Sequence, residues 1–168
     1  MGEIFSAAPL DRLVILEGNT AVERTFRSVR LAIDQMLRGK IAKRPILSTE
    51  PAVLDYLRIS MAFEPVERLR VLFLNASNEL IADELHGVGS VSAVHVFPRE
   101  IVKRSLEVGA TALVLAHNHP SGNPAPSRAD IELTRLIVEA AHVLGIAIHD
   151  HLVIARRGWV SFRREGYL

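Results

Sequence analysis

Apolar residues in the first third of the chain recur at the three- and four-residue spacing of amphipathic helices. Thr20 and Glu23 form a capping-box pattern, and Gly39 is typical of a helix end, so we predict a helix over residues 20–38. Its apolar positions are Val22, Phe26, Val29, Ile33, Met36 and Leu37. A second, shorter helix is expected with Pro51 in its first turn.

From residue 67 onward, the pattern changes to short apolar runs that alternate with helical spacing. Strands are predicted at residues 69–74, 79–86, 93–97, 111–116, 146–155 and 159–162. Helices are predicted at residues 98–108, opened by Pro98 and closed by Gly109, and from Ser127 to about Gly145. This alternation predicts an α/β domain over residues 46–168.

Composition narrows the chemistry that such a domain can perform. The chain has 168 residues, of which 49% are hydrophobic and 23% charged, as is usual for a globular protein. It contains no cysteine, which excludes disulfides, thiol nucleophiles and zinc sites built on sulfur. Any metal must therefore be held by histidine, carboxylate or water. No secretory signal and no membrane-length apolar run are visible, so we expect a cytoplasmic protein.

Basic residues are concentrated in the N-terminal segment. Residues 1–18 lack periodicity, and Lys40 to Pro45 resembles a linker, so we predict a basic helical segment over residues 1–45. Its cations are Arg24, Arg27, Arg30, Arg38, Lys40, Lys43 and Arg44. A solvated helix face is the ordinary interpretation, and a nucleic-acid surface is the alternative. The net charge of +1 favours the former.

Two histidines separated by one residue stand where the predicted strand 111–116 meets a proline-rich loop. At a strand end, the spacing of His117 and His119 puts both imidazoles on the same side. Asp130 lies in the first turn of the next helix, and two histidines with one carboxylate form a common catalytic zinc set. The pair alone is a weak signal, however, and Ser127 with Asp130 also fits an ordinary capping box.

The combined pattern is more specific than its parts. The run His117-Asn118-His119-Pro120-Ser121-Gly122, followed by Pro126-Ser127 and Asp130, resembles the JAMM motif of MPN-type metalloproteases in the form of the bacterial RadC branch. The resemblance covers roughly residues 45–168. It implies a mixed sheet flanked by helices, similar to the cytidine deaminase scaffold. It also implies Zn²⁺ held by His117, His119 and Asp130, with Ser127 polarising the reacting group.

The same family uses an upstream glutamate as general base, and two positions compete for that role. Glu67 precedes an apolar strand, as in the family pattern, and is favoured over Glu84. His149 and His151 form a second pair with the same spacing. No carboxylate follows them at a helix start, so we expect a structural or supporting role rather than a rival metal site.

The resemblance implies hydrolysis of a peptide or isopeptide bond in a protein or peptide substrate that the sequence does not identify. The RadC branch usually carries an N-terminal helix-hairpin-helix region that binds nucleic-acid backbone. Only residues 16–20 match part of such a region here. A DNA-associated accessory role, supported by the basic helix and by Arg156, Arg157, Arg163 and Arg164, is therefore the alternative function. The sequence does not predict an oligomeric state.

Overall fold

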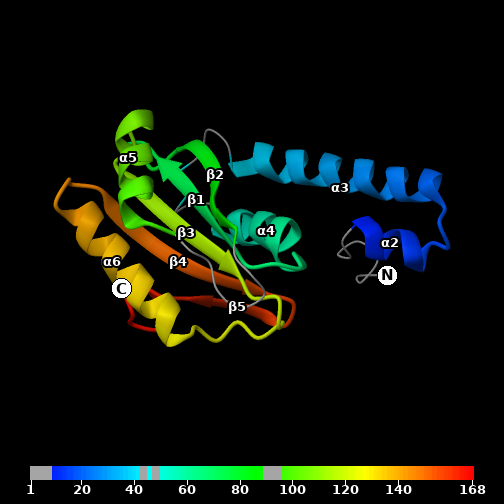
Figure 1. The fold of residues 1–168 in the computed structure, drawn as a ribbon. Helices are drawn as coiled ribbons and strands as arrows, with labels where there is room; N and C mark the ends of the chain where they lie inside the picture. Colours follow the sequence, from blue (N-terminus) through cyan, green and yellow to red (C-terminus); the bar gives the residue numbers. More distant parts are fainter. Residues whose placement is uncertain (1–8, 42–44, 47–49, 89–95) are drawn as a thin grey trace.

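The computed structural model describes residues 9–41, 45–46, 50–88 and 96–168 (Figure 1). Five strands form one sheet in the order β2-β1-β3-β4-β5. Their bounds are β1 Arg68–Leu74, β2 Leu80–Val88, β3 Ala112–Asn118, β4 Ala147–Ala155 and β5 Gly158–Ser161. Strands β3 and β4 are parallel and the other neighbours are antiparallel, which confirms the mixed sheet.

Helices cover both faces of this sheet (Figure 1). Helix α4 (Glu50–Met61) packs on one face, and helices α5 (Pro98–Val108) and α6 (Arg128–His142) pack on the other. Alternate residues of β3 enter the two cores because successive side chains of a strand point to opposite faces. Val114 and Ala116 face α4, whereas Leu113 and Leu115 face the α5–α6 side. All seven residues of β3 are buried, as expected for a central strand.

A β-bulge interrupts the pairing of β3 with β4. Leu113 pairs with Ile148, but Val114 pairs with Asp150, so His149 is the extra residue. The bulge reverses the alternation of side chains along β4. Consequently Ile148 and His151 both lie on the α5–α6 side, although three positions separate them.

The N-terminal segment differs from the sequence prediction in three respects. Helix α2 (Pro9–Ile15) was not predicted, because residues 1–18 show no helical periodicity. Helix α3 (Thr20–Ile41) continues through Gly39 instead of ending there. Its cap is Asn19, whose side chain accepts a hydrogen bond from the Val22 amide, whereas Glu23 is buried and forms an ion pair with Arg12. The proposed capping box was therefore wrong by one position.

Other predicted elements agree with the structure within a few residues. The expected strand at residues 93–97 falls largely outside the described residues. The domain boundary near residue 45 stays a prediction. Among the described residues, no helix combines the length and apolarity needed to cross a membrane.

Several arginines that support a nucleic-acid interpretation have partners within the chain. Arg30 lies 2.7 Å from a carboxylate oxygen of Glu64, and Arg38 lies 3.3 Å from Asp83. In the C-terminal group, Arg164 forms an ion pair with Glu50, and Arg163 donates to main-chain carbonyls of β4. These contacts reduce the charge available for phosphates, and DNA binding stays a prediction.

Candidate metal centre

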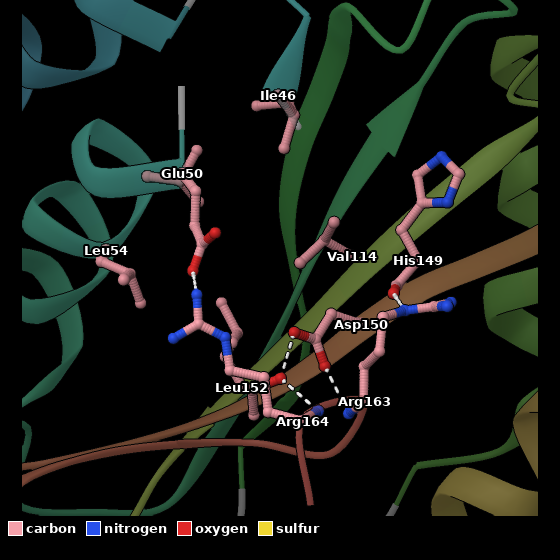
Figure 2. Close-up of a pocket in the computed structure, with 11 residues that line it drawn as sticks. Ile46, Glu50, Leu54, Val114, His149, Asp150, Leu152, Arg163 and Arg164 are labelled. Atoms are coloured by element: carbon pink, nitrogen blue, oxygen red, sulfur yellow. Dashed lines mark hydrogen bonds and ion pairs between the residues drawn. The ribbon is translucent and has the colours of Figure 1, made fainter. Parts of the chain in front are cut away.

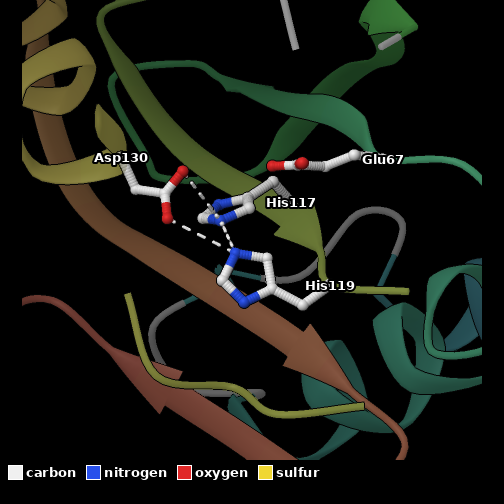
Figure 3. Close-up of side chains that lie close together, drawn as sticks. All are labelled: Glu67, His117, His119 and Asp130. Carbon is white, nitrogen blue, oxygen red and sulfur yellow. Dashed lines mark hydrogen bonds and ion pairs between the residues drawn. The ribbon is translucent and has the colours of Figure 1, made fainter. Parts of the chain in front are cut away.

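Four titratable side chains meet at the C-terminal end of β3 (Figure 3). They are Glu67, His117, His119 and Asp130, and each offers a ligand atom within 4.8 Å of those of the others. Three come from one stretch, residues 117–130, whereas Glu67 lies immediately before β1. The side chains of Glu67 and His117 are buried, and those of His119 and Asp130 are half-buried.

The two histidines face each other at the strand end. His117 is the penultimate residue of β3, and the amide of His119 continues the pairing with β4 by donating to the Ile154 carbonyl at 3.0 Å. Their Nε2 atoms are 3.0 Å apart, in keeping with the side-by-side placement expected from their spacing. The site therefore depends on a buried strand that fixes both backbone positions.

Asp130 is held by the start of α6. Its Oδ2 atom accepts from the Ser127 amide at 2.7 Å, and its own amide donates to Ser127 Oγ at 3.2 Å. This is the capping box, so the structural interpretation of these two residues is correct. The same carboxylate also reaches the histidines, with Oδ1 3.5 Å from His117 Nε2 and Oδ2 3.3 Å from His119 Nε2. The helix cap thus aims Asp130 at the cluster.

The cluster shifts the pKa values of its members. Burial opposes the ionised form of Asp130, but the neighbouring imidazoles of His117 and His119 outweigh it and hold its pKa far below the usual range. The hydrogen bond with Asp130 raises the pKa of His119, which favours its protonated form. Burial raises the pKa of Glu67, and Asp130 adds to this effect while the two histidines oppose it. Asp130 therefore stabilises a positive charge on His119.

Asn118, between the two histidines, fixes the backbone on both sides of Glu67. Its side chain points away from theirs because successive strand residues alternate. Asn118 Oδ1 accepts from the Arg68 amide at 2.9 Å, and Nδ2 donates to the Val66 carbonyl at 3.0 Å. The asparagine is fully buried. Sequence reasoning gave Asn118 no separate role, although its central place in the His-Asn-His run was a usable signal.

The structure separates the two competing glutamates. Glu84 lies in β2 and accepts hydrogen bonds from Arg104 of α5, the shortest being 2.7 Å, and these lower its pKa. It does not belong to the cluster, whereas Glu67 does.

The second histidine pair is divided by the bulge. His149 lies near Asn78, with 2.6 Å between Nε2 and Oδ1, and lines a pocket of about 310 Å³ on the α4 side (Figure 2). There Asp150 accepts hydrogen bonds from the Ser161 hydroxyl and the Arg163 amide. His151 lies on the opposite face of the sheet and contacts His117. The two histidines therefore cannot chelate one ion together.

The fold and the cluster together define a class: a mixed α/β domain with a candidate metal site of two histidines and two carboxylates at a strand end. Residues 47–167 match the family model described as the RadC-like JAB domain. The chain is 49% identical over 163 residues to a UPF0758 protein of Rhodobacter capsulatus, covering 96% of this chain and 76% of that protein. It is 43% identical over 162 residues to a UPF0758 protein of Ruegeria pomeroyi, covering 96% and 72% respectively. The chain belongs to the RadC family.

Proposed function

We propose that this protein is a Zn²⁺-dependent hydrolase of peptide or isopeptide bonds. The observation that carries the proposal is the convergence of His117, His119, Asp130 and Glu67 within 4.8 Å at one strand end. Two imidazoles and one carboxylate suit zinc and leave a further coordination position for water. Zinc supplies Lewis-acid polarisation there and lowers the pKa of water towards ~7.

Glu67 is the proposed general base. It is the only member of the cluster outside residues 117–130, and its raised pKa suits a group that accepts and then returns a proton. In this role it takes a proton from the attacking water and delivers it to the leaving amine. Asn118 supports the role by holding the main chain on both sides of the carboxylate.

Ser127 is proposed to assist at the carbonyl oxygen of the substrate. Its Oγ accepts from the Asp130 amide, so the hydroxyl proton is not used by the helix cap. That proton can be donated to an oxygen that gains negative charge during the reaction. Capping and polarisation are thus compatible in one residue.

Metal content measured on purified protein tests the ligand set. We expect about one zinc per wild-type chain by plasma mass spectrometry across transition metals, and little in the His117→Ala/His119→Ala double variant. The matched control is His142→Ala/His149→Ala, which removes two histidines outside the cluster and should keep its zinc. Equal, negligible zinc in all three proteins would contradict the proposal.

The proposed base is tested on the zinc-loaded protein with a panel of amide and isopeptide substrates, which would also identify the scissile bond. Glu67→Gln should retain zinc and lose about 10²–10⁴-fold in rate, the usual contribution of general acid–base catalysis. Glu84→Gln is the matched control and should keep its activity. The opposite pattern would assign the base to Glu84.

A further inference from the structure

The ring nitrogen of His117 that points away from the cluster contacts a second histidine. His117 Nδ1 lies 2.8 Å from His151 Nε2, and His151 Nδ1 lies 2.6 Å from the Thr134 hydroxyl. Thr134 Oγ1 in turn lies 2.6 Å from the main-chain carbonyl of Asp130. All three residues are buried: Thr134 and His151 are each 1% exposed, and His117 is 3% exposed. We call this series, from the Asp130 carbonyl to His117, the tautomer chain.

The direction of every hydrogen bond in the tautomer chain follows from its end. A carbonyl oxygen only accepts, so the single hydroxyl proton of Thr134 points to Asp130. Thr134 Oγ1 must then accept from His151 Nδ1, which places the His151 proton on that atom. His151 is 1% exposed, and the hydrogen bonds of its ring nitrogens go to the Thr134 hydroxyl and to His117, so no carboxylate bonded to the ring balances a charge there. The ring is therefore neutral, and its Nε2 atom bears a lone pair. His151 Nε2 therefore accepts a hydrogen bond that His117 Nδ1 donates.

The consequence appears on the opposite nitrogen of His117. A neutral imidazole carries one proton, so a proton fixed on Nδ1 leaves a lone pair on Nε2, the atom that faces His119 and Asp130. A main-chain carbonyl likewise holds a proton on His119 Nδ1, because this atom lies 2.9 Å from the Asn123 oxygen. His119 Nε2, 3.0 Å from His117 Nε2 and 3.3 Å from Asp130 Oδ2, is then a donor in the metal-free protein, so His117 is the ligand that already offers its lone pair.

We propose that Thr134 and His151 are positioning residues that fix the tautomer and ring orientation of His117. The proposal deepens the proposed function, since a lone pair on His117 Nε2 matters for a metal in the cluster. The ring of Phe162 lies 4.7 Å from that of His151 at an interplanar angle of 30° and limits its movement. Thr134 is one helical turn after Asp130, so α6 supplies both a candidate ligand and the start of the tautomer chain.

The first test determines the tautomer of His117 directly in the metal-free protein. Long-range ¹H–¹⁵N correlation spectra of the labelled protein at pH 8 distinguish protonated from unprotonated ring nitrogens. We expect a protonated Nδ1 and an unprotonated Nε2 for His117, and a protonated Nδ1 for His151. A His117 proton on Nε2 in the wild-type protein would overturn the proposal whether or not zinc binds.

The second test compares two substitutions at Thr134. Thr134→Val keeps the shape and removes the hydroxyl, whereas Thr134→Ser keeps the hydroxyl. The valine variant should shift the His117 proton towards Nε2 and weaken zinc affinity by about 10–100-fold in competition with a chelating indicator, as is usual when the support of a metal ligand is lost. The serine variant should restore the wild-type tautomer and stay within about threefold of its affinity.

The outcomes separate this inference from the proposed function. A wild-type tautomer and affinity in Thr134→Val would refute the tautomer chain and leave the zinc site standing. A wild-type protein that binds no zinc but shows the expected His117 tautomer would refute the zinc site and leave the chain of hydrogen bonds intact. Circular dichroism of each variant confirms that the compared proteins are folded.

Discussion

Replacing Asn118 with alanine should loosen the segment that carries Glu67. The substitution removes the acceptor of the Arg68 amide and the donor to the Val66 carbonyl, at 2.9 and 3.0 Å. Each buried main-chain group left without a partner costs about 1–3 kcal/mol. Two such groups give a range of about 2–6 kcal/mol. Because both hydrogen bonds are only partly buried, we expect the lower part of this range, a loss of about 2–4 kcal/mol in the free energy of unfolding. His117 and His119 keep their own contacts.

Urea unfolding of the metal-free protein measures this loss, and hydrogen exchange locates it. The matched control is Asn75→Ala, which also removes an acceptor of two main-chain amides, those of Ser77 and Glu79, in the turn between β1 and β2. Both variants should lose stability, but only Asn118→Ala should speed exchange in residues 64–70. Equal exchange there in the two variants would refute the assignment of Asn118 as the residue that holds Glu67 in place.

Three further predictions concern the pH dependence of zinc binding, the pH dependence of stability and the loop at Gly122. Zinc must displace the proton that the hydrogen bond with Asp130 holds on His119. The apparent affinity for zinc should therefore fall by up to about tenfold per pH unit below the raised pKa of His119. Calorimetry in buffers of different ionisation enthalpy should detect the released proton. Burial lowers the pKa of His151, so its contribution to stability is present above the unfolded pKa of about 6.5 and is lost below it. The loss is at most about 1.4 kcal/mol per pH unit. Between pH 7.5 and 5, the unfolding free energy from urea titrations should fall more steeply for the metal-free wild type than for His151→Phe. Gly122 has a φ of 84°, and an added Cβ would lie 3.4 Å from Arg156 Nε. Gly122→Ala should therefore lower the unfolding free energy by about 1–2 kcal/mol, measured by thermal unfolding. An unchanged unfolding free energy would show that the loop can relax around the added methyl group.

The α/β domain was predictable because its patterns are local. The apolar run of β3 and the start of α6 at Ser127 each result from a few neighbouring residues. The N-terminal segment was less predictable, because α3 continues through a glycine that usually ends a helix. Helical context outweighs the preference of Gly39 there, at a cost of about 1 kcal/mol relative to alanine.

The candidate site was also only partly predictable from the sequence. His117, His119 and Asp130 are close in sequence, so their motif was visible before their geometry was known. The family pattern favoured Glu67 over Glu84, but its place in the cluster depends on the pairing of β1 with β3, which sequence spacing does not provide. The residues that hydrogen-bond to this cluster, such as His151, were harder still to predict, because they come from separate elements.

The bulge in β4 is a specific example of what spacing cannot predict. Alternation along a regular strand would put His149 and His151 on one face. One extra residue in the pairing with β3 puts them on opposite faces and brings His151 to His117. A bulge of this kind leaves no distinct mark in the residues around it.

The origin of three candidate ligands in residues 117–130 has a consequence for the unfolded chain. A denatured molecule keeps His117, His119 and Asp130 within a short tether, so it retains some affinity for zinc. Ligand-induced stabilisation depends on the difference between the affinities of the folded and unfolded states. Zinc should therefore raise the melting temperature less than its affinity for the native protein implies. Glu67 joins these residues only when β1 and β3 are paired, so metal uptake can precede assembly of the complete cluster during folding.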